Sequence, residues 1–530
     1  MLIKEYLNVC DKIDNGLLAE KNEVQILNEL ICKLEADKEA RQLIGEDLYK
    51  VFKTNYQSYG KRELRQFIEL FDASLDGKDY LNLIKQHLIS EVKDNKKQEI
   101  NRLLLQFVCE VKNVGYASRF IYKCLNRYLI NPISIGCDAF EDFINEFSGE
   151  ESEYRLIIEE QKELAEYCLA FSEDLKFKRI PFEDLPEEIE KVDRIKAYIK
   201  VEQIEALDEY VAVAKAKTII KAVEHFYLFY RHELHVTDAK CYVFTNNKYV
   251  YIEPEAKGIQ KSIKGIKQQS LVNDAKVMFE FAINKPDNFY DLMRIMDIHN
   301  TAVCMDSAAN ALLSMWSIFE ILLEKETSKA SGSRITQITK MMEPFLKCHY
   351  IRGLVNQFKE DFERFDNKKM KEVLANISEG TSSTEKMYAL IILNKYDVLR
   401  DELYKQWNEY PLLRNRLFIL NEELSTNRST KRLIENHVKK TTWQLYRIYR
   451  ARNCIIHDGE SIQNIEDLVE NLHNYIDELC KGIIENASKR SAAFSVADVI
   501  YEMKIKNKLY DKRLEAEQIS EENFCTFLNF

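Results

Sequence analysis

The chain has 530 residues, a length that predicts roughly three domains at about 100–200 residues per domain. Hydrophobic residues make up 46% and charged residues 31% of the chain, which excludes an intrinsically disordered protein. The net charge of −11 argues against a protein coated with nucleic-acid contacts, since such proteins have a basic surface, but it leaves room for one local basic site. The 14 glycines and 7 prolines are far below the average usage of about 7% and 5%, so long helices are expected rather than a turn-rich all-β architecture.

The twelve cysteines occur singly, without a CxxC pair. This distribution argues against a disulfide scaffold or a paired-cysteine zinc site, and we expect reduced thiols in a cytoplasmic protein without a metal or other cofactor. Residues 1–16 have charges inside their apolar run, so no signal peptide is expected. No stretch approaches about 18 uninterrupted apolar residues, so no membrane contact is predicted.

Apolar residues three and four apart predict successive amphipathic helices over residues 1–175. Two prolines within 179–190 indicate a boundary, because a proline disfavours helix at the residue before it. We therefore expect a helical N-terminal domain over 1–180 and a helical connector over 181–286. The connector is expected to hold one small β-hairpin near 241–253, where two aromatic and β-branched runs meet at two asparagines.

The remaining chain is predicted to be helical again, which gives an all-α fold class for the whole protein. A helical bundle is expected over 287–490 and a C-terminal helical tail over 491–530. The first long helix of the bundle is predicted over 300–326, and the last two over 429–456 and 462–487.

The segment with the clearest chemical potential is YRIYRARNCIIHDGE, residues 446–460. Asn453 and His457 are four residues apart and share one face of a helix that turns about 100° per residue, and Arg452 lies beside them. Gly459 is predicted to end this helix, because glycine adopts the left-handed conformation of a C-cap readily. An arginine, an amide and an imidazole are therefore expected to gather at a helix end, where a substrate can approach.

The spacing of this arginine and histidine is weak evidence by itself, since the chain holds more than one such pair. Only the last pair has a polar residue directly after the arginine and a glycine after the histidine, so context rather than spacing singles it out. The three pairs are Arg294/His299, Arg432/His437 and Arg452/His457.

In this context the sequence resembles the HEPN ribonuclease superfamily, particularly its ApeA-like and abortive-infection branches in bacterial anti-phage defence. The signature of that superfamily is an arginine, a polar residue and then a histidine four to six residues after the arginine, and RNCIIH at 452–457 is similar to its short form. The first core helix of the family often carries an acidic residue after an apolar run, and LLSMWSIFEILL with Glu320 is similar. The resemblance covers about 290–488.

The resemblance implies a HEPN-like helical nuclease that cleaves RNA, with tRNA among the candidates, without a metal, by attack of the 2′-hydroxyl on its own phosphodiester. It implies His457 as general base or acid, Arg452 as phosphate ligand, Asn453 as an orienting amide and Glu320 as the partner of the arginine. It also implies a homodimer with a composite active site. Anti-phage defence or toxin-like growth arrest, with a phage-derived or cellular trigger or an antitoxin, is the expected role. The helical domain over 1–180 is then expected to be the sensor or regulator.

The charge pattern independently favours an anionic ligand near this motif. Eight lysines and arginines stand against one acid between 428 and 452, whereas 458–478 has seven acids and no base. A basic strip beside an acidic one would guide RNA to a groove. Alternatively, the two helices pair their opposite charges along an antiparallel hairpin. The candidate RNA-binding residues are Arg447, Arg450, Lys439 and Lys440.

Two further features of the sequence bear on its function. The C-terminal bundle is alternatively a non-catalytic scaffold for dimerisation or partner binding, which the acidic composition favours. The segment FYRHELH at 229–235 brings two histidines and a glutamate together, but it departs from the H-E-x-x-H spacing of a zincin, so no metal site is predicted there.

Overall fold

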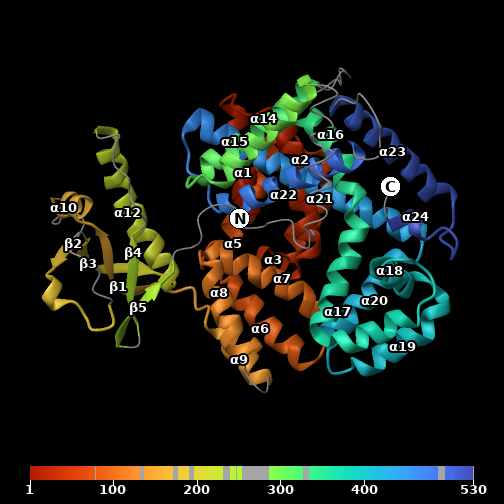
Figure 1. The fold of residues 1–530 in the computed structure, drawn as a ribbon, viewed down its shortest axis with the longest axis horizontal. Helices are drawn as coiled ribbons and strands as arrows, with labels where there is room; N and C mark the ends of the chain where they lie inside the picture. The colour runs from red at the N-terminus through yellow and green to blue at the C-terminus, as the bar shows by residue number, and fades with distance from the viewer. Residues whose placement is uncertain are drawn as a thin grey trace. The chain divides into compact units, whose positions relative to one another are not determined.

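The computed structural model divides the chain into two compact units, each described by itself (Figure 1). The first unit comprises Met1–Ser74 and Lys257–Phe530, and the second comprises Leu75–Ala256. The structure describes residues 1–77, 79–131, 136–170, 177–189, 196–230, 239–245, 247–253, 286–325, 333–487 and 496–528.

The described residues are predominantly helical, which confirms the predicted fold class. No helix among them combines the length and the apolar character that crossing a bilayer requires. The N-terminal helices of the first unit are α1 (Leu2–Asp14), α2 (Lys21–Ala36), α3 (Lys38–Ile44), α4 (Glu46–Asn55) and α5 (Lys61–Leu75). Its C-terminal helices are α14 (Pro286–Val303), α15 (Ala308–Lys325), α16 (Arg334–Cys348), α17 (Tyr350–Ala375), α18 (Ser383–Ile392), α19 (Asp397–Gln406), α20 (Pro411–Leu424), α21 (Asn427–Asp458), α22 (Ile465–Ala487), α23 (Val496–Ala516) and α24 (Cys525–Leu528).

The C-terminal helices enclose two hydrophobic cores. The first lies among α14, α15, α16, α21, α22 and α23 and contains the fully buried Trp316 and Phe345. The second lies among α17 to α20 and α24 and contains the buried Phe362 and Trp407. Burial of apolar surface of this kind is the main favourable term in folding, so the two cores fix the helices around them.

Helix α21 takes part in both cores, and its ends are well defined. Ile434 near its start is buried in the second core, and Leu445 further along is buried in the first. The side chain of Thr426 caps the N-terminus by accepting a hydrogen bond from the backbone N–H of Ser429. Gly459 follows the C-terminus with φ of 62°, in the left-handed conformation predicted for it.

One prediction about the C-terminal helices is wrong. The helix predicted over 300–326 is interrupted between α14 and α15, where Ser307 accepts a hydrogen bond from the backbone N–H of Asn310 and so starts a new helix. The predicted helical tail over 491–530 contains α23, which buries Val499 and Ile500 in the first core. A hydrophobic pattern identifies an apolar face but not the element against which that face packs.

The second unit combines helices with a five-stranded antiparallel sheet of strand order β2-β3-β1-β4-β5. The predicted hairpin is confirmed as β4 and β5, and Asn247 in its turn has φ of 61°. Helices α10 and α12 pack against one face of the sheet. The strands are β1 (Ser152–Gln161), β2 (Phe177–Ile180), β3 (Lys196–Ala206), β4 (Lys240–Thr245) and β5 (Lys248–Ile252), and the helices are α6 (Tyr80–Lys93), α7 (Lys97–Val114), α8 (Ser118–Leu125), α9 (Cys137–Asn145), α10 (Lys162–Ala170) and α12 (Glu209–Tyr230).

The sheet is larger than the predicted hairpin, and its central strand β1 lies where a helix was predicted. Leu156, Ile157 and Ile158 are all buried, because both faces of this strand are covered. Such a strand is a continuous apolar run rather than an alternating one, and periodicity cannot separate it from a buried helix segment.

The units also divide the chain differently from the predicted boundaries at 180 and 286. Helices α1 to α5 belong to the same unit as the C-terminal helices, whereas α6 to α9 belong with the sheet. Helix α2 lies against α21, more than 400 residues later, which is a contact that local sequence patterns do not encode.

The partly buried His437 of α21 makes the stability of the first unit depend on pH. The ring of His437 stacks on Tyr350 with centroids 3.7 Å apart, and burial lowers the pKa of His437 to about 4. In the unfolded chain the imidazole takes up a proton near pH 6.5. Between these values the unfolded state binds more protons, so stability falls as the pH is lowered from 6.5 towards 4.

We expect His437→Phe to remove this dependence, which amounts to about 2 kcal/mol between pH 7 and pH 5. Urea unfolding followed by tryptophan fluorescence measures it, because all three tryptophans lie in the first unit. The control is His457→Phe, which changes an exposed histidine of the same helix and should keep the wild-type dependence. An unchanged pH dependence in His437→Phe would contradict the assignment.

Candidate functional site

Arg452 lies near the end of α21 and contacts α15 of the same bundle. Its Nη2 lies 3.4 Å from Oε1 of Glu320, and its Nη1 donates a 3.1 Å hydrogen bond to Oδ1 of Asn453. Arg452 and Glu320 are each partly buried. The structure therefore brings together three of the four residues predicted as catalytic, from segments 132 residues apart.

His457 is exposed at the last turn of α21, directly before the helix end at Gly459. Among the described residues, no hydrogen bond or ion pair joins His457 to another side chain. Asn453, one turn earlier, is buried. The site thus consists of an anchored arginine and amide with a solvent-accessible imidazole beyond them.

A further arginine, which the sequence did not single out, lies near the same glutamate. Nη1 of Arg334, at the start of α16, is 3.9 Å from Oε1 of Glu320, and its Nη2 is 3.9 Å from Oε1 of Glu324. Arg334 is more than half exposed, so these contacts are weak and leave the guanidinium free to meet another anion. Only the folded chain reveals this neighbour, because the sequence does not show which residue of α16 lies beside Glu320 of α15.

Of the predicted RNA-binding residues, Arg450 is buried and Arg447 is partly buried. Arg447 donates to both carboxylate oxygens of Glu5 at 3.1 Å and to Glu29 at 2.9 Å, and the buried Arg450 also donates to Glu5. Burial alone would raise the pKa of Glu5, but the two guanidinium groups reverse this effect and hold the pKa below its usual range. In this conformation the two arginines are neutralised by α1 and α2 and do not form a basic surface.

The other end of α1 contacts the residues that flank His457. Nζ of Lys12 donates a 2.8 Å hydrogen bond to Glu460 and a second one to Asp458. These contacts, together with those of Glu5, fix α1 along the C-terminal half of α21. The candidate catalytic end of α21 is therefore held by the N-terminal helix of the chain.

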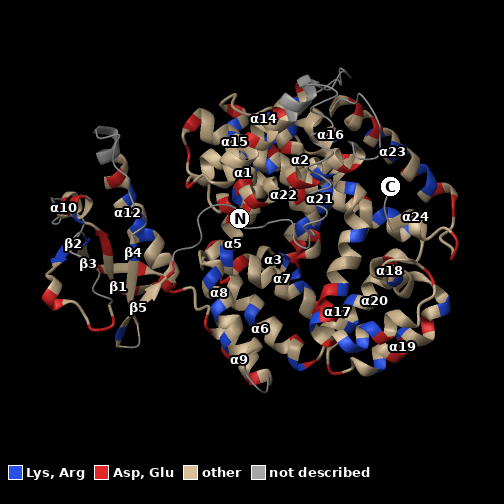
Figure 2. Ribbon diagram, viewed as in Figure 1, with Lys and Arg blue, Asp and Glu red and all other residues tan. Residues whose placement is uncertain are grey.

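The rest of the basic strip is also partly neutralised, by acids from elements other than α22. Lys431 contacts Glu515 of α23 at 2.8 Å, and Arg432 contacts Glu423 of α20 at 3.4 Å. Lys439 and Lys440 are exposed, and the ammonium of Lys439 lies 5.0 Å from the centroid of the Trp443 ring. Figure 2 accordingly shows basic and acidic residues interspersed along the helices of the unit. These contacts therefore match neither a continuous basic strip nor a pairing of opposite charges between α21 and α22.

Two clusters among the described residues have donor atoms spaced for a metal ion, and the sequence predicted neither. The histidine-rich segment considered from the sequence, at 229–235, lies outside the described residues from 231 on. The first cluster is His299, His473 and Asp477, and the second is Cys454, Asp458 and Glu460.

A buried carboxyl group in the sheet of the second unit was also missed. Burial raises the pKa of Glu160 on β1 to about 7, and the backbone N–H of Gln161 donates to its Oε1 at 2.7 Å. A carboxyl group with this pKa is able to exchange protons near neutral pH. The available signal was a pair of acidic residues, Glu159 and Glu160, directly after an apolar run, which is equally typical of an amphipathic helix.

No protein-family model matches the chain, and neither a curated protein nor a solved structure shows significant similarity to it.

Removing the carboxylate of Glu5 is expected to destabilise the first unit strongly. In Glu5→Gln the buried Arg450 loses its charged partner, and breaking one member of a buried ion pair costs about 3–5 kcal/mol. The matched control is Glu20→Gln, which removes an exposed ion pair with Lys61 and should cost less than about 1 kcal/mol. Urea unfolding at pH 7, followed by tryptophan fluorescence, measures both. Equal effects of the two substitutions would show that Glu5 does not hold the helices together.

Proposed function

We propose that the protein is a HEPN-type, metal-independent endoribonuclease that acts as a homodimer in the cytoplasm. Its role is anti-phage defence or toxin-like growth arrest, with RNA as the substrate and tRNA as the first candidate. The observation that carries the proposal is the contact between Glu320 on α15 and Arg452 on α21, beside the exposed His457. A tertiary contact that joins both elements of the sequence resemblance supports the resemblance more strongly than the short motif alone.

The chemistry of these side chains suits RNA cleavage without a metal. The 2′-oxygen attacks the adjacent phosphorus, the P–O5′ bond breaks, and the fragments end in a 2′,3′-cyclic phosphate and a 5′-hydroxyl. His457 takes the proton from the 2′-hydroxyl or gives one to the leaving 5′-oxygen. The guanidinium of Arg452 stabilises the negative charge that develops on the phosphate, and Asn453 and Glu320 orient that guanidinium.

One histidine supplies only one of the two proton-transfer groups of this reaction. The second comes from the same motif of the partner protomer, which is the reason for the proposed dimer with a composite site. Arg334 of α16, which is more than half exposed beside Glu320, is an additional candidate for contacting the RNA backbone.

In this proposal the N-terminal helices restrain the nuclease. Helix α1 neutralises Arg447 and Arg450 through Glu5 and holds Asp458 and Glu460 through Lys12. A trigger that displaces α1 would expose the two arginines beside the motif. The basic surface expected from the sequence would then become available to RNA.

We expect Arg452→Ala to lower RNA cleavage by at least about 10²-fold, because the substitution removes the group that stabilises the phosphate charge. Purified proteins are incubated with total RNA and tRNA in EDTA, and cleavage is followed on denaturing gels. The control Arg432→Ala removes an exposed, ion-paired arginine of the same helix and should cleave as wild type does. Cleavage by Arg452→Ala at the wild-type rate would overturn the assigned site.

Loss of the Lys12 contacts is expected to raise the cleavage rate several-fold, because it loosens α1 next to His457. The matched control is Lys61→Ala, which breaks an exposed ion pair of the same N-terminal region away from α21. The same gel assay compares the initial rates of Lys12→Ala and Lys61→Ala. If both variants cleave at the wild-type rate, α1 does not restrain the site.

A non-catalytic scaffold is the second candidate, and the burial of Arg447 and Arg450 favours it. If their ion pairs with α1 and α2 are permanent, these arginines serve the fold rather than RNA. The scaffold predicts a folded protein that leaves RNA intact, with α1 present or displaced.

A further inference from the structure

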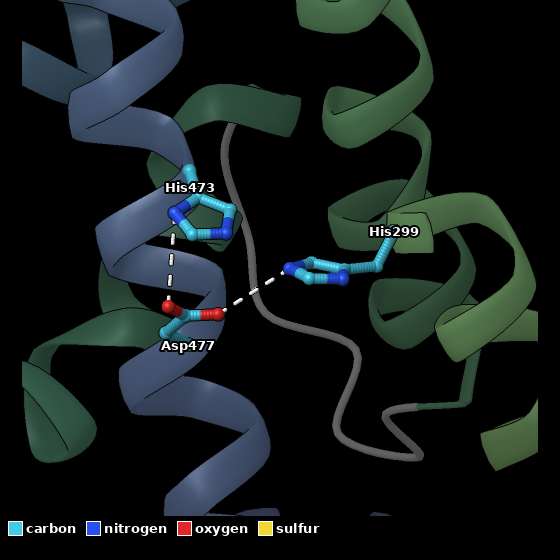
Figure 3. A group of neighbouring side chains, drawn as sticks. All are labelled: His299, His473 and Asp477. Carbon is cyan, nitrogen blue, oxygen red and sulfur yellow. Dashed lines mark ion pairs between the residues drawn. The ribbon is translucent and has the colours of Figure 1, made fainter. Parts of the chain in front are cut away.

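Two imidazole rings and one carboxylate converge between α14 and α22 (Figure 3). His473 and Asp477 are one turn apart on α22 and therefore share a face, and His299 faces them from α14. Nε2 of His299 lies 3.3 Å from Oδ1 of Asp477, and Nδ1 of His473 lies 3.7 Å from Oδ2. One donor atom of each residue lies within 4.8 Å of the other two.

The donor set and its spacing match those of a transition-metal ion. Imidazole nitrogens and carboxylate oxygens bind Zn²⁺ at about 2.0–2.2 Å, which places neighbouring ligand atoms of a tetrahedral site roughly 3.3 Å apart. The distance from His299 to Oδ1 of Asp477 matches this separation, and the slightly longer distance from His473 runs to the other oxygen of the same carboxylate. The three donor atoms lie within 4.8 Å of one another, so binding an ion requires the side chains to draw closer together.

The surroundings also suit a bound ion. His473 is buried, whereas His299 and Asp477 keep 24% and 19% of their side-chain surface exposed. One side of the cluster is therefore covered by protein, and the other side is accessible to solvent. The two imidazole rings lie 5.0 Å apart at 25° and would repel each other if both were protonated. Neutral rings that share a cation with the carboxylate avoid this repulsion.

The second cluster makes a useful contrast. Its carboxylates, Asp458 and Glu460, already receive hydrogen bonds from the ammonium group of Lys12. A cation of the protein itself therefore occupies the position that a metal would take.

We propose that His299, His473 and Asp477 form a Zn²⁺ site that joins α14 to α22 and keeps a fourth coordination position open to solvent. The site is separate from the residues proposed for RNA cleavage and does not depend on that proposal. The ion would add a metal-dependent link between α14 and α22 to the packing of α14 in the first core.

The test is a titration of the chelator-treated, full-length protein with Zn²⁺ under reducing conditions, by calorimetry. Wild type should bind one equivalent more than His299→Gln and Asp477→Asn, and Zn²⁺ should raise the thermal unfolding midpoint of wild type but not of these two variants. Asp458→Asn, which alters the second cluster, should bind as wild type does. Asp477→Asn preserves the size and shape of the side chain, so it keeps the comparison valid if the histidine substitution disturbs folding.

Equal stoichiometry in wild type and both variants, or no binding by folded wild type, would overturn the proposal. Co²⁺ provides an independent readout of the same site. Its visible absorption should report tetrahedral coordination in wild type and Asp458→Asn, and this signal should be absent from Asp477→Asn.

Discussion

The architecture of the first unit depends on a buried ion-pair network between its first and last parts. Glu5 and Glu29, from α1 and α2, contact Arg447 and Arg450 of α21. Moving charged groups out of water costs free energy. The attraction between the partners offsets this cost only when they are held in good geometry. The network therefore holds the N-terminal helices beside the C-terminal bundle, in agreement with the placement of both segments in one compact unit.

The same network also determines which arginines near the candidate site are available to bind an anion. A basic helix in an acidic protein indicated an RNA-binding surface, but that inference treated each charge as if its partner had to be close in sequence. The carboxylates that neutralise Arg447 and Arg450 come from more than 400 residues earlier. The acid beside Arg452 comes from α15. The proposed regulation by displacement of α1 rests on the way in which these charges are paired.

Local patterns predicted those features that are encoded locally. The amphipathic period identified α21 and α22, Gly459 ended α21 as expected, and the two asparagines marked the β4–β5 turn. The predicted partnership of Glu320 with Arg452 agrees with a contact in the structure, whereas its catalytic role stays a prediction. Central strand β1 was missed because it is covered on both faces, and the cluster of His299, His473 and Asp477 was missed because its members come from two helices distant in sequence.

The end chemistry of RNA fragments tests the central claim most directly. Purified wild type, Lys12→Ala and His457→Ala are incubated with tRNA in EDTA, and the fragment ends are identified by mass spectrometry. The account predicts 2′,3′-cyclic phosphate and 5′-hydroxyl ends from wild type or from the released Lys12→Ala protein, and intact RNA with His457→Ala. Intact RNA with all three proteins, or the same fragments with His457→Ala, would contradict it.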